Sequence, residues 1–121
     1  MIVLADTSVW IEHFRRREAG LAPLLDAGRV VMHPMVLGEL ALGALPSRAE
    51  LITMLGLLRT TTVAEPAEVM GMVERVPLWG RGLGWVDAHV LASALLDRVR
   101  LWTLDRPLAA AAAELGVAFT L

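Results

Sequence analysis

The sequence contains no cysteine and no lysine, and these two absences exclude several classes of protein. Without cysteine there is no disulfide bridge and no thiolate-ligated metal site. Without lysine there is no P-loop, which needs a lysine on the nucleotide phosphates, and no Schiff-base catalysis. Receiver domains and haloacid-dehalogenase phosphatases also place acids at strand ends, but both use a lysine. All 11 basic residues are arginines.

The chain also lacks an uninterrupted apolar stretch of the ~18 residues that a membrane span needs. The residues before Asp6 are apolar, but they are few and lack the basic flank of a signal peptide. We therefore expect a cytoplasmic protein without membrane contact. The mean hydropathy is nevertheless +0.60, and this apolar excess predicts surface that is covered by a partner or by a second copy.

A chain of 121 residues has the size of one domain, and it shows neither a repeat nor a linker. We therefore expect a single domain over residues 1–121. The net charge of −2 argues against a general nucleic-acid binder. If four of the 13 acids form a metal site, however, the 11 arginines outnumber the remaining acids by two. An acidic pocket in such a body suits an enzyme that binds phosphates through metal ions.

Short apolar runs alternate with helical patterns along the chain. Strands are expected at residues 1–5, 29–32, 60–63, 101–104 and 117–120. Helices are expected after Asp6, with Thr7 or Ser8 as the cap, and at residues 21–27, 34–45, 47–58, 66–76, 85–97 and 107–115. This alternation predicts an α/β layer fold with a mostly parallel sheet.

Two acids, Asp6 and Asp105, directly follow predicted strands. Ligands of open α/β sheets bind beyond the carboxyl ends of the strands, so both carboxylates should emerge at the same edge. An aspartate in this position can also be a simple turn or cap residue, which explains either acid alone equally well.

Two further acids, Glu39 and Asp87, lie on apolar stripes of predicted helices that look mostly buried. An ionised carboxylate there is costly unless it is paired or bound to a metal. A buried salt bridge explains one such acid, but the sequence offers no comparable set of interior arginines for four. A divalent cation removes the repulsion between them, and oxygen ligands favour Mg²⁺ or Mn²⁺ over Zn²⁺. Asp87 also lies in a first helical turn, where the helix dipole favours its ionised form.

Four segments carry a resemblance to a known family: MIVLADTSVWIEHFR, HPMVLGELALGAL, GRGLGWVDAHVLASALL and LWTLDRPL. They resemble the PIN-domain ribonucleases, specifically the VapC-type toxins of bacterial toxin–antitoxin pairs, and follow the family's order at about its spacing. GELALG and GWVDAHVLASALL are the more specific motifs. The resemblance implies a three-layer α/β/α sandwich with a central, mostly parallel sheet. It also implies Mg²⁺-dependent endonucleolytic cleavage of RNA, with Mn²⁺ as a substitute.

Position by position, the resemblance assigns metal binding and catalysis to four acids, namely Asp6, Glu39, Asp87 and Asp105. We expect Asp6 and Asp87 to hold one or two ions directly, and the other two acids to bind through waters.

Neighbouring positions match the substrate-binding part of such sites. Thr7, Ser8 and Thr103 match the small hydroxyl residues that line them. Arg81 lies in the glycine-rich loop 80–84, at the expected rim of the cleft, where it can contact a substrate phosphate. Arg15, Arg16 and Arg17 can hold RNA phosphates, or they can simply be a solvated helix end. His33 is expected to help begin the helix at Pro34.

The family also implies an antitoxin that packs over apolar surface near the first helices and blocks the acidic pocket. The apolar excess fits a homodimer equally well. Two other functions stay open: a DNA nuclease on the same fold, and an α/β module that binds RNA or a protein without cutting.

Overall fold

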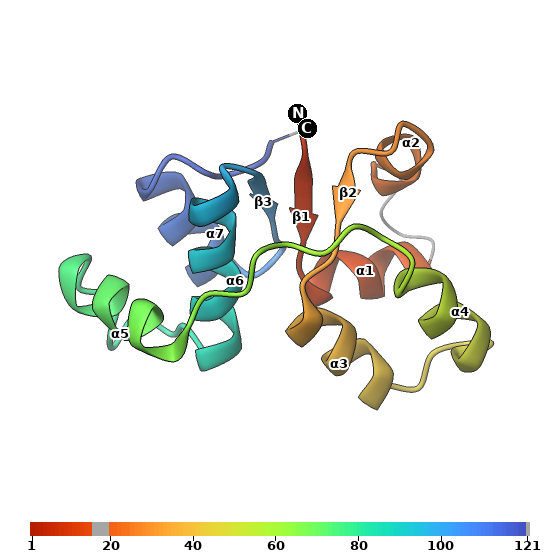
Figure 1. Ribbon diagram of the computed structural model, residues 1–121, viewed down its shortest axis with the longest axis horizontal. Helices are drawn as coiled ribbons and strands as arrows, with labels where there is room; N and C mark the ends of the chain where they lie inside the picture. The colour runs from red at the N-terminus through yellow and green to blue at the C-terminus, as the bar shows by residue number, and fades with distance from the viewer. Residues whose placement is uncertain (16–19, 121) are drawn as a thin grey trace.

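The computed structural model describes residues 1–15 and 20–120. A three-stranded parallel sheet forms its centre, with β1 (Val3–Ala5) between β2 (Val30–Val31) and β3 (Arg100–Trp102) (Figure 1). All three residues of β1 are buried, which is why its sequence is an uninterrupted apolar run. The predicted parallel sheet is confirmed.

The register of the sheet brings the ends of the strands together. Leu4, the middle residue of β1, lies opposite Val31 of β2 and Leu101 of β3. Because the strands run in the same direction, their carboxyl ends meet at one edge, the lower edge in Figure 1. Residues that directly follow these strands are therefore neighbours in space.

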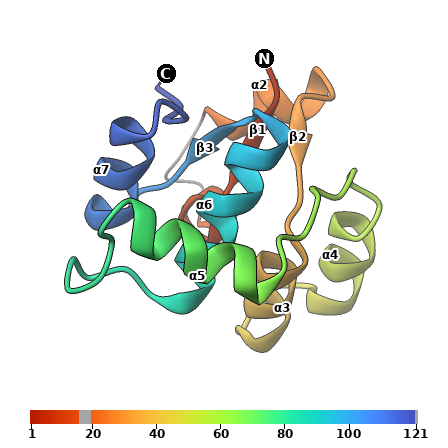
Figure 2. The ribbon, with the colours of Figure 1, turned by 60° about the vertical axis from the view of Figure 1, so that its left-hand side comes forward.

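Helices cover both faces of the sheet; in Figure 2, α6 lies in front of it and α2 behind it. The described residues form α1 (Thr7–Phe14), α2 (Leu21–Asp26), α3 (Pro34–Leu42), α4 (Arg48–Leu55), α5 (Pro66–Arg75), α6 (Trp85–Asp97) and α7 (Arg106–Glu114). The arrangement confirms the predicted sandwich. None of these helices is both long and apolar enough to cross a membrane.

The two helices expected to be mostly buried differ in the structure. All residues of α6 from Ala88 to Ala94 are buried, as predicted. The outer side of α3 is open to solvent instead, with Glu39 exposed and the side chain of Leu42 91% exposed. The prediction that α3 is mostly buried is therefore wrong. Its residues are apolar on all sides, but neighbouring elements cover only one of those sides, at Val36 and Leu40.

Other differences concern the ends of elements. The predicted strands at 60–63 and 117–120 are reduced to single bridges, Met32 to Thr60 and Leu101 to Ala118. Both segments lie at the outer edges of the short sheet, and each pairs with the sheet through a single residue. The helix expected from residue 47 begins at Arg48; Ser47 adopts φ +47 and its side chain does not cap the helix. α3 ends at Leu42, before Gly43, rather than at Leu45.

Candidate active site

Asp6 stands where β1 ends and α1 begins. Its N–H donates to the carbonyl of Trp102 at 3.0 Å, which places it beside the end of β3. Its Oδ1 accepts the N–H of Val9 at 3.3 Å and so caps α1. The prediction that Thr7 or Ser8 caps this helix is therefore wrong. Aspartate is as good an N-cap as serine, and residue 6 has the extended backbone that the capping position requires.

Two hydroxyl groups hold the carboxylate of Asp6 from opposite sides. Ser8 Oγ donates to Oδ1 at 2.5 Å, and Thr103 Oγ1 donates to Oδ2. Each hydroxyl also accepts a backbone N–H. Leu104 donates to Ser8 Oγ and Asp105 donates to Thr103 Oγ1, both at 3.0 Å. The network fixes the orientation of Asp6 and links it to the segment that carries Asp105.

Thr7 plays the same part for Glu39. Its Oγ1 donates to Glu39 Oε1 at 2.6 Å, which connects α1 to α3. All three predicted hydroxyl residues therefore contact an acid of the candidate site. Their expected role in substrate binding stays a prediction, and the sequence did not show that their hydroxyls donate to the acids.

The remaining two acids lie at helix N-termini. Asp87 Oδ2, in the first turn of α6, accepts the N–H of Gly84 at 3.0 Å. Asp105 Oδ2 caps α7 by accepting the N–H of Leu108 at 3.1 Å. Together with Asp6, three of the acids occupy first turns or caps, where the positive end of the helix dipole favours a negative charge.

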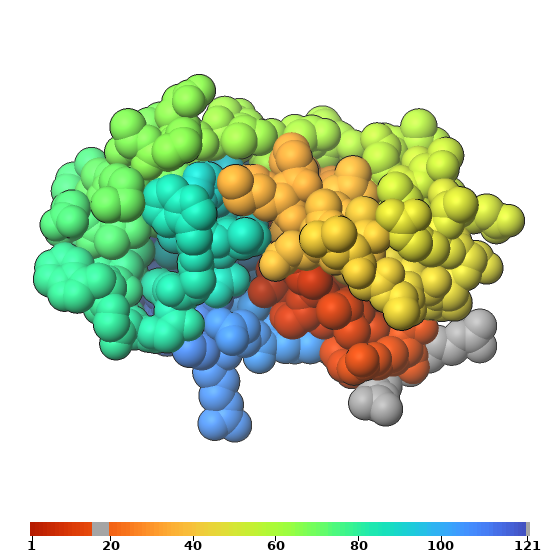
Figure 3. Space-filling model, turned by 90° about the horizontal axis from the view of Figure 1, so that it is seen from below, coloured from red at the N-terminus to blue at the C-terminus, as the bar shows by residue number. Residues whose placement is uncertain are grey.

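Asp87 lies within electrostatic reach of each of the other three acids. Burial raises the pKa of Asp6, against its hydrogen bonds, and the charge of Asp87 raises it further. Burial also raises the pKa of Asp87, opposed by the Gly84 N–H and reinforced by the charges of Asp105 and Glu39. For Asp87, burial and the like charges therefore outweigh the hydrogen bond from the Gly84 N–H. Figure 3 shows the face on which α1, α3, α6 and the blue C-terminal segment meet.

The donors fit a hydrated cation. Among residues 1–15 and 20–120, no group of three or more His, Cys, Asp or Glu side chains lies close enough together to hold a metal ion by itself. The acids offer only oxygen ligands, and their mutual repulsion favours a cation between them. Mg²⁺ takes oxygen ligands and keeps several of its waters, which bridge donors that are too far apart to bind it directly. The set therefore suits Mg²⁺ better than Zn²⁺.

Arg81 is paired with an acid of α7. Its guanidinium donates to Glu114 at 2.7 Å, in an ion pair on the surface. Glu114 is the last residue of α7, whereas Asp105 caps the first turn, about 13 Å away along the helix axis. The guanidinium is therefore engaged with α7, while the loop itself borders the site: Gly84 donates to Asp87, and Gly82 lies against Pro107. A contact of Arg81 with a substrate phosphate stays a prediction. Sequence spacing did not reveal the ion pair, because its partners lie 33 positions apart.

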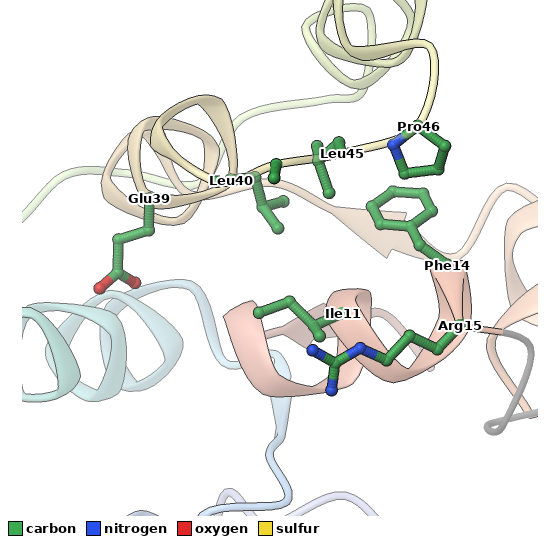
Figure 4. Close-up of a pocket in the computed structure, with 9 residues that line it drawn as sticks. Ile11, Phe14, Arg15, Glu39, Leu40, Leu45 and Pro46 are labelled. Carbon is green, nitrogen blue, oxygen red and sulfur yellow. The ribbon is translucent and has the colours of Figure 1, made fainter.

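An apolar hollow of about 220 Å³ opens beside Glu39, between α1 and the end of α3 (Figure 4). Ile11, Phe14, Leu40 and Leu45 are among the residues that line it. In Figure 4 the charged ends of Arg15 and Glu39 lie on the same side of it. Arg15 also pairs with Glu12 at 3.3 Å. The other two arginines of the predicted cluster, Arg16 and Arg17, lie outside the described residues.

The raised pKa values predict that the metal-free protein loses stability as the pH rises. Between the ordinary pKa of aspartate and the raised pKa values of Asp6 and Asp87, these carboxyls are protonated in the folded protein but ionised in the unfolded chain. The folded state therefore binds more protons, and the free energy of unfolding falls as the pH rises through this range. Asp87→Asn removes one repelling charge. We expect it to raise the melting temperature in EDTA at pH 7 by about 3 °C, a small gain because solvent screens the site.

Circular dichroism melts in EDTA between pH 4 and pH 8 measure this effect. Asp26→Asn, which changes an exposed acid of α2, is the matched control and should keep the pH dependence of the natural protein. The same slope in both variants would contradict the electrostatic coupling of Asp87.

Comparison with known proteins gives three findings. The family model of the PIN domain matches residues 3–114. The chain is 48% identical over 118 residues to "Ribonuclease VapC32" of Mycobacterium tuberculosis, from strains CDC 1551 / Oshkosh and ATCC 25618 / H37Rv, covering 97% of this chain and 95% of the relative. The fold of this chain is similar to that in the crystal structure of PAE2754 from Pyrobaculum aerophilum. The TM-score is 0.65 at 17% identity, and the match covers 91% of this chain and 84% of that one.

Proposed function

The chain belongs to the PIN-domain family as a VapC-type nuclease, and we propose that it is a Mg²⁺-dependent endoribonuclease, the toxin of a VapBC-type toxin–antitoxin pair. The observation that supports the chemistry is that Asp87 interacts electrostatically with three carboxylates from distant parts of the chain, namely those of Asp6, Glu39 and Asp105. Acting on RNA, the enzyme would work in the cytoplasm.

In this proposal Asp6 and Asp87 bind Mg²⁺ directly, while Glu39 and Asp105 bind it through waters. The ion, when bound, activates water and stabilises charge on the leaving oxygen of the phosphodiester. Ser8 and Thr103 act through Asp6, whose carboxylate they hold in one orientation.

The helices contribute to binding as well. The N-terminal ends of α1, α6 and α7 carry partial positive charge close to the acids, which favours a phosphate group once the carboxylates are neutralised. No protein nucleophile is required, so the absence of cysteine does not limit this chemistry.

The test of the proposed function is cleavage of a structured RNA by the purified protein, with Mg²⁺ and with EDTA. We expect cleavage with Mg²⁺ and its loss in EDTA, and no cleavage of a single-stranded DNA of the same sequence. Cutting of DNA alone would favour the DNA nuclease, and Mg²⁺ binding with both substrates intact would favour a non-catalytic module.

Thr103→Val should lower the rate of RNA cleavage by about 10- to 100-fold, because a group that orients a metal ligand typically contributes this much. Valine keeps the shape of threonine but cannot donate to Asp6. Single-turnover rates at saturating RNA measure the effect, and Thr103→Ser, which retains the hydroxyl, should recover most of the rate. A fully active Thr103→Val protein would show that the hydroxyl does not support Asp6.

The partners follow from the same site. We propose that an antitoxin packs into the apolar hollow lined by Ile11 and Phe14 and sends a positively charged side chain toward the acids. Co-expression with the cognate antitoxin should therefore abolish RNA cleavage. The exposed apolar side chains outside this hollow, such as Trp79 and Met70, would be covered in a homodimer, which sedimentation measures.

A further inference from the structure

A fully buried polar contact joins the two helices that carry Glu39 and Asp87. His33 directly precedes α3 and Ser93 lies within α6, and both residues are 0% exposed. His33 Nε2 lies 3.1 Å from Ser93 Oγ. Polar groups this deep in a core are costly unless they are paired, so the two side chains must form a hydrogen bond in the folded protein.

The hydrogen bonds of His33 determine its tautomer. Nδ1 accepts the N–H of Met35 at 3.0 Å and caps α3, which confirms that His33 helps to begin this helix. The ring proton therefore sits on Nε2 and is donated to Ser93 Oγ. Burial and the neighbouring His89 lower the pKa of His33, so the ring stays neutral and keeps this arrangement.

The two acids are equally far from the contact along their own helices. Glu39 follows His33 by six residues in α3, and Asp87 precedes Ser93 by six residues in α6. Each acid is thus about 9 Å from the contact along its helix axis. In Figure 1, α3 descends from the lower edge of the sheet while α6 rises past it.

The two acids need such a connection because their like charges push α3 and α6 apart. α3 is poorly anchored on its outer side, where Leu42 is 91% exposed. On its inner side α3 is held by buried Val36 and Leu40, and the His33–Ser93 hydrogen bond joins its N-terminal end to α6.

We propose that the His33–Ser93 hydrogen bond is a positioning link, which sets the separation of Glu39 and Asp87 and thereby the affinity of the acidic site for a divalent cation. The inference rests on the proposed function, since it assigns these two acids to one cation. His33 and Ser93 act through the helices and touch neither the cation nor the RNA.

The test is Mn²⁺ binding to the RNA-free protein, followed by electron paramagnetic resonance. Ser93→Ala removes the acceptor of the link, and His33→Asn keeps a capping side chain for α3 but is too short to reach Ser93. We expect each variant to bind Mn²⁺ about tenfold more weakly. The Mg²⁺ concentration for half-maximal cleavage should rise by the same factor, while KM for RNA and kcat at saturating Mg²⁺ stay within about twofold.

Val69→Ala, in the core-facing side of α5, is the control for a general loss of packing. It should lower the melting temperature without changing the affinity for Mn²⁺. Unchanged affinity in Ser93→Ala, or an equal loss in Val69→Ala, would overturn the link while leaving the proposed function intact. A natural protein that binds no Mn²⁺ and cleaves RNA in EDTA would overturn both.

Discussion

Asparagine in place of Asp6 should reduce RNA cleavage by on the order of 1,000-fold or more, because it removes the charged ligand at the centre of the acidic site. The variant should still fold. Asparagine caps a helix as well as aspartate does, so the hydrogen bond from the Val9 N–H of α1 to the side chain at position 6 is kept. Loss of a buried charge should also leave the metal-free protein at least as stable as the natural one, since burial raises the pKa of Asp6.

Single-turnover cleavage at saturating Mg²⁺ measures the first part of this prediction, and a thermal melt in EDTA measures the second. Glu50→Gln, an exposed acid in the first turn of α4, is the control and should cleave at the natural rate. A folded Asp6→Asn protein with a rate within tenfold of natural would defeat the metal mechanism.

Leu4→Ala should destabilise the fold by about 3 kcal/mol and lower the melting temperature by roughly 12 °C. Leu4 is completely buried in the central strand, between Val31 and Leu101. Its truncation removes apolar contacts and leaves a cavity in a sheet of only three strands. The loss is a large part of the ~5–15 kcal/mol by which domains of this kind are stable.

Urea unfolding followed by tryptophan fluorescence measures this loss, and Trp10 and Trp102, which are both buried, report on it. Leu57→Ala removes the same atoms from a side chain that is 82% exposed. Its stability should change by less than ~0.5 kcal/mol. Similar losses in the two variants would show that β1 is not the centre of the core.

The fold was largely predictable because its signals are local. The apolar runs around Leu4 and Leu101 and the helical patterns between them correctly indicated a parallel α/β sheet, and α6 was placed with its observed ends. The failures lie where strands are short: residues 60–63 and 117–120 have strand-like composition but pair through single bridges. The residue types of a segment set its strand propensity, whereas the formation of a paired strand depends on the neighbouring strand in the folded protein.

The sequence could name candidate residues for the site, which stay a prediction, but it could not give their contacts. The four acids could be named because carboxylates after strands and on apolar helices are costly without a ligand. The exposure of Glu39 and the ion pair that draws Arg81 to Glu114 could not be read from spacing.

The sequence by itself determined which segments are strands and helices and which acids are available to a metal, because periodicity, apolar runs and capping residues act over a few positions. Only the tertiary structure decided how those acids are held. The Thr103 hydroxyl reaches Asp6 across 97 positions, and His33 reaches Ser93 across 60. Such contacts depend on how packed elements are oriented in three dimensions, and no local pattern of residues encodes that orientation.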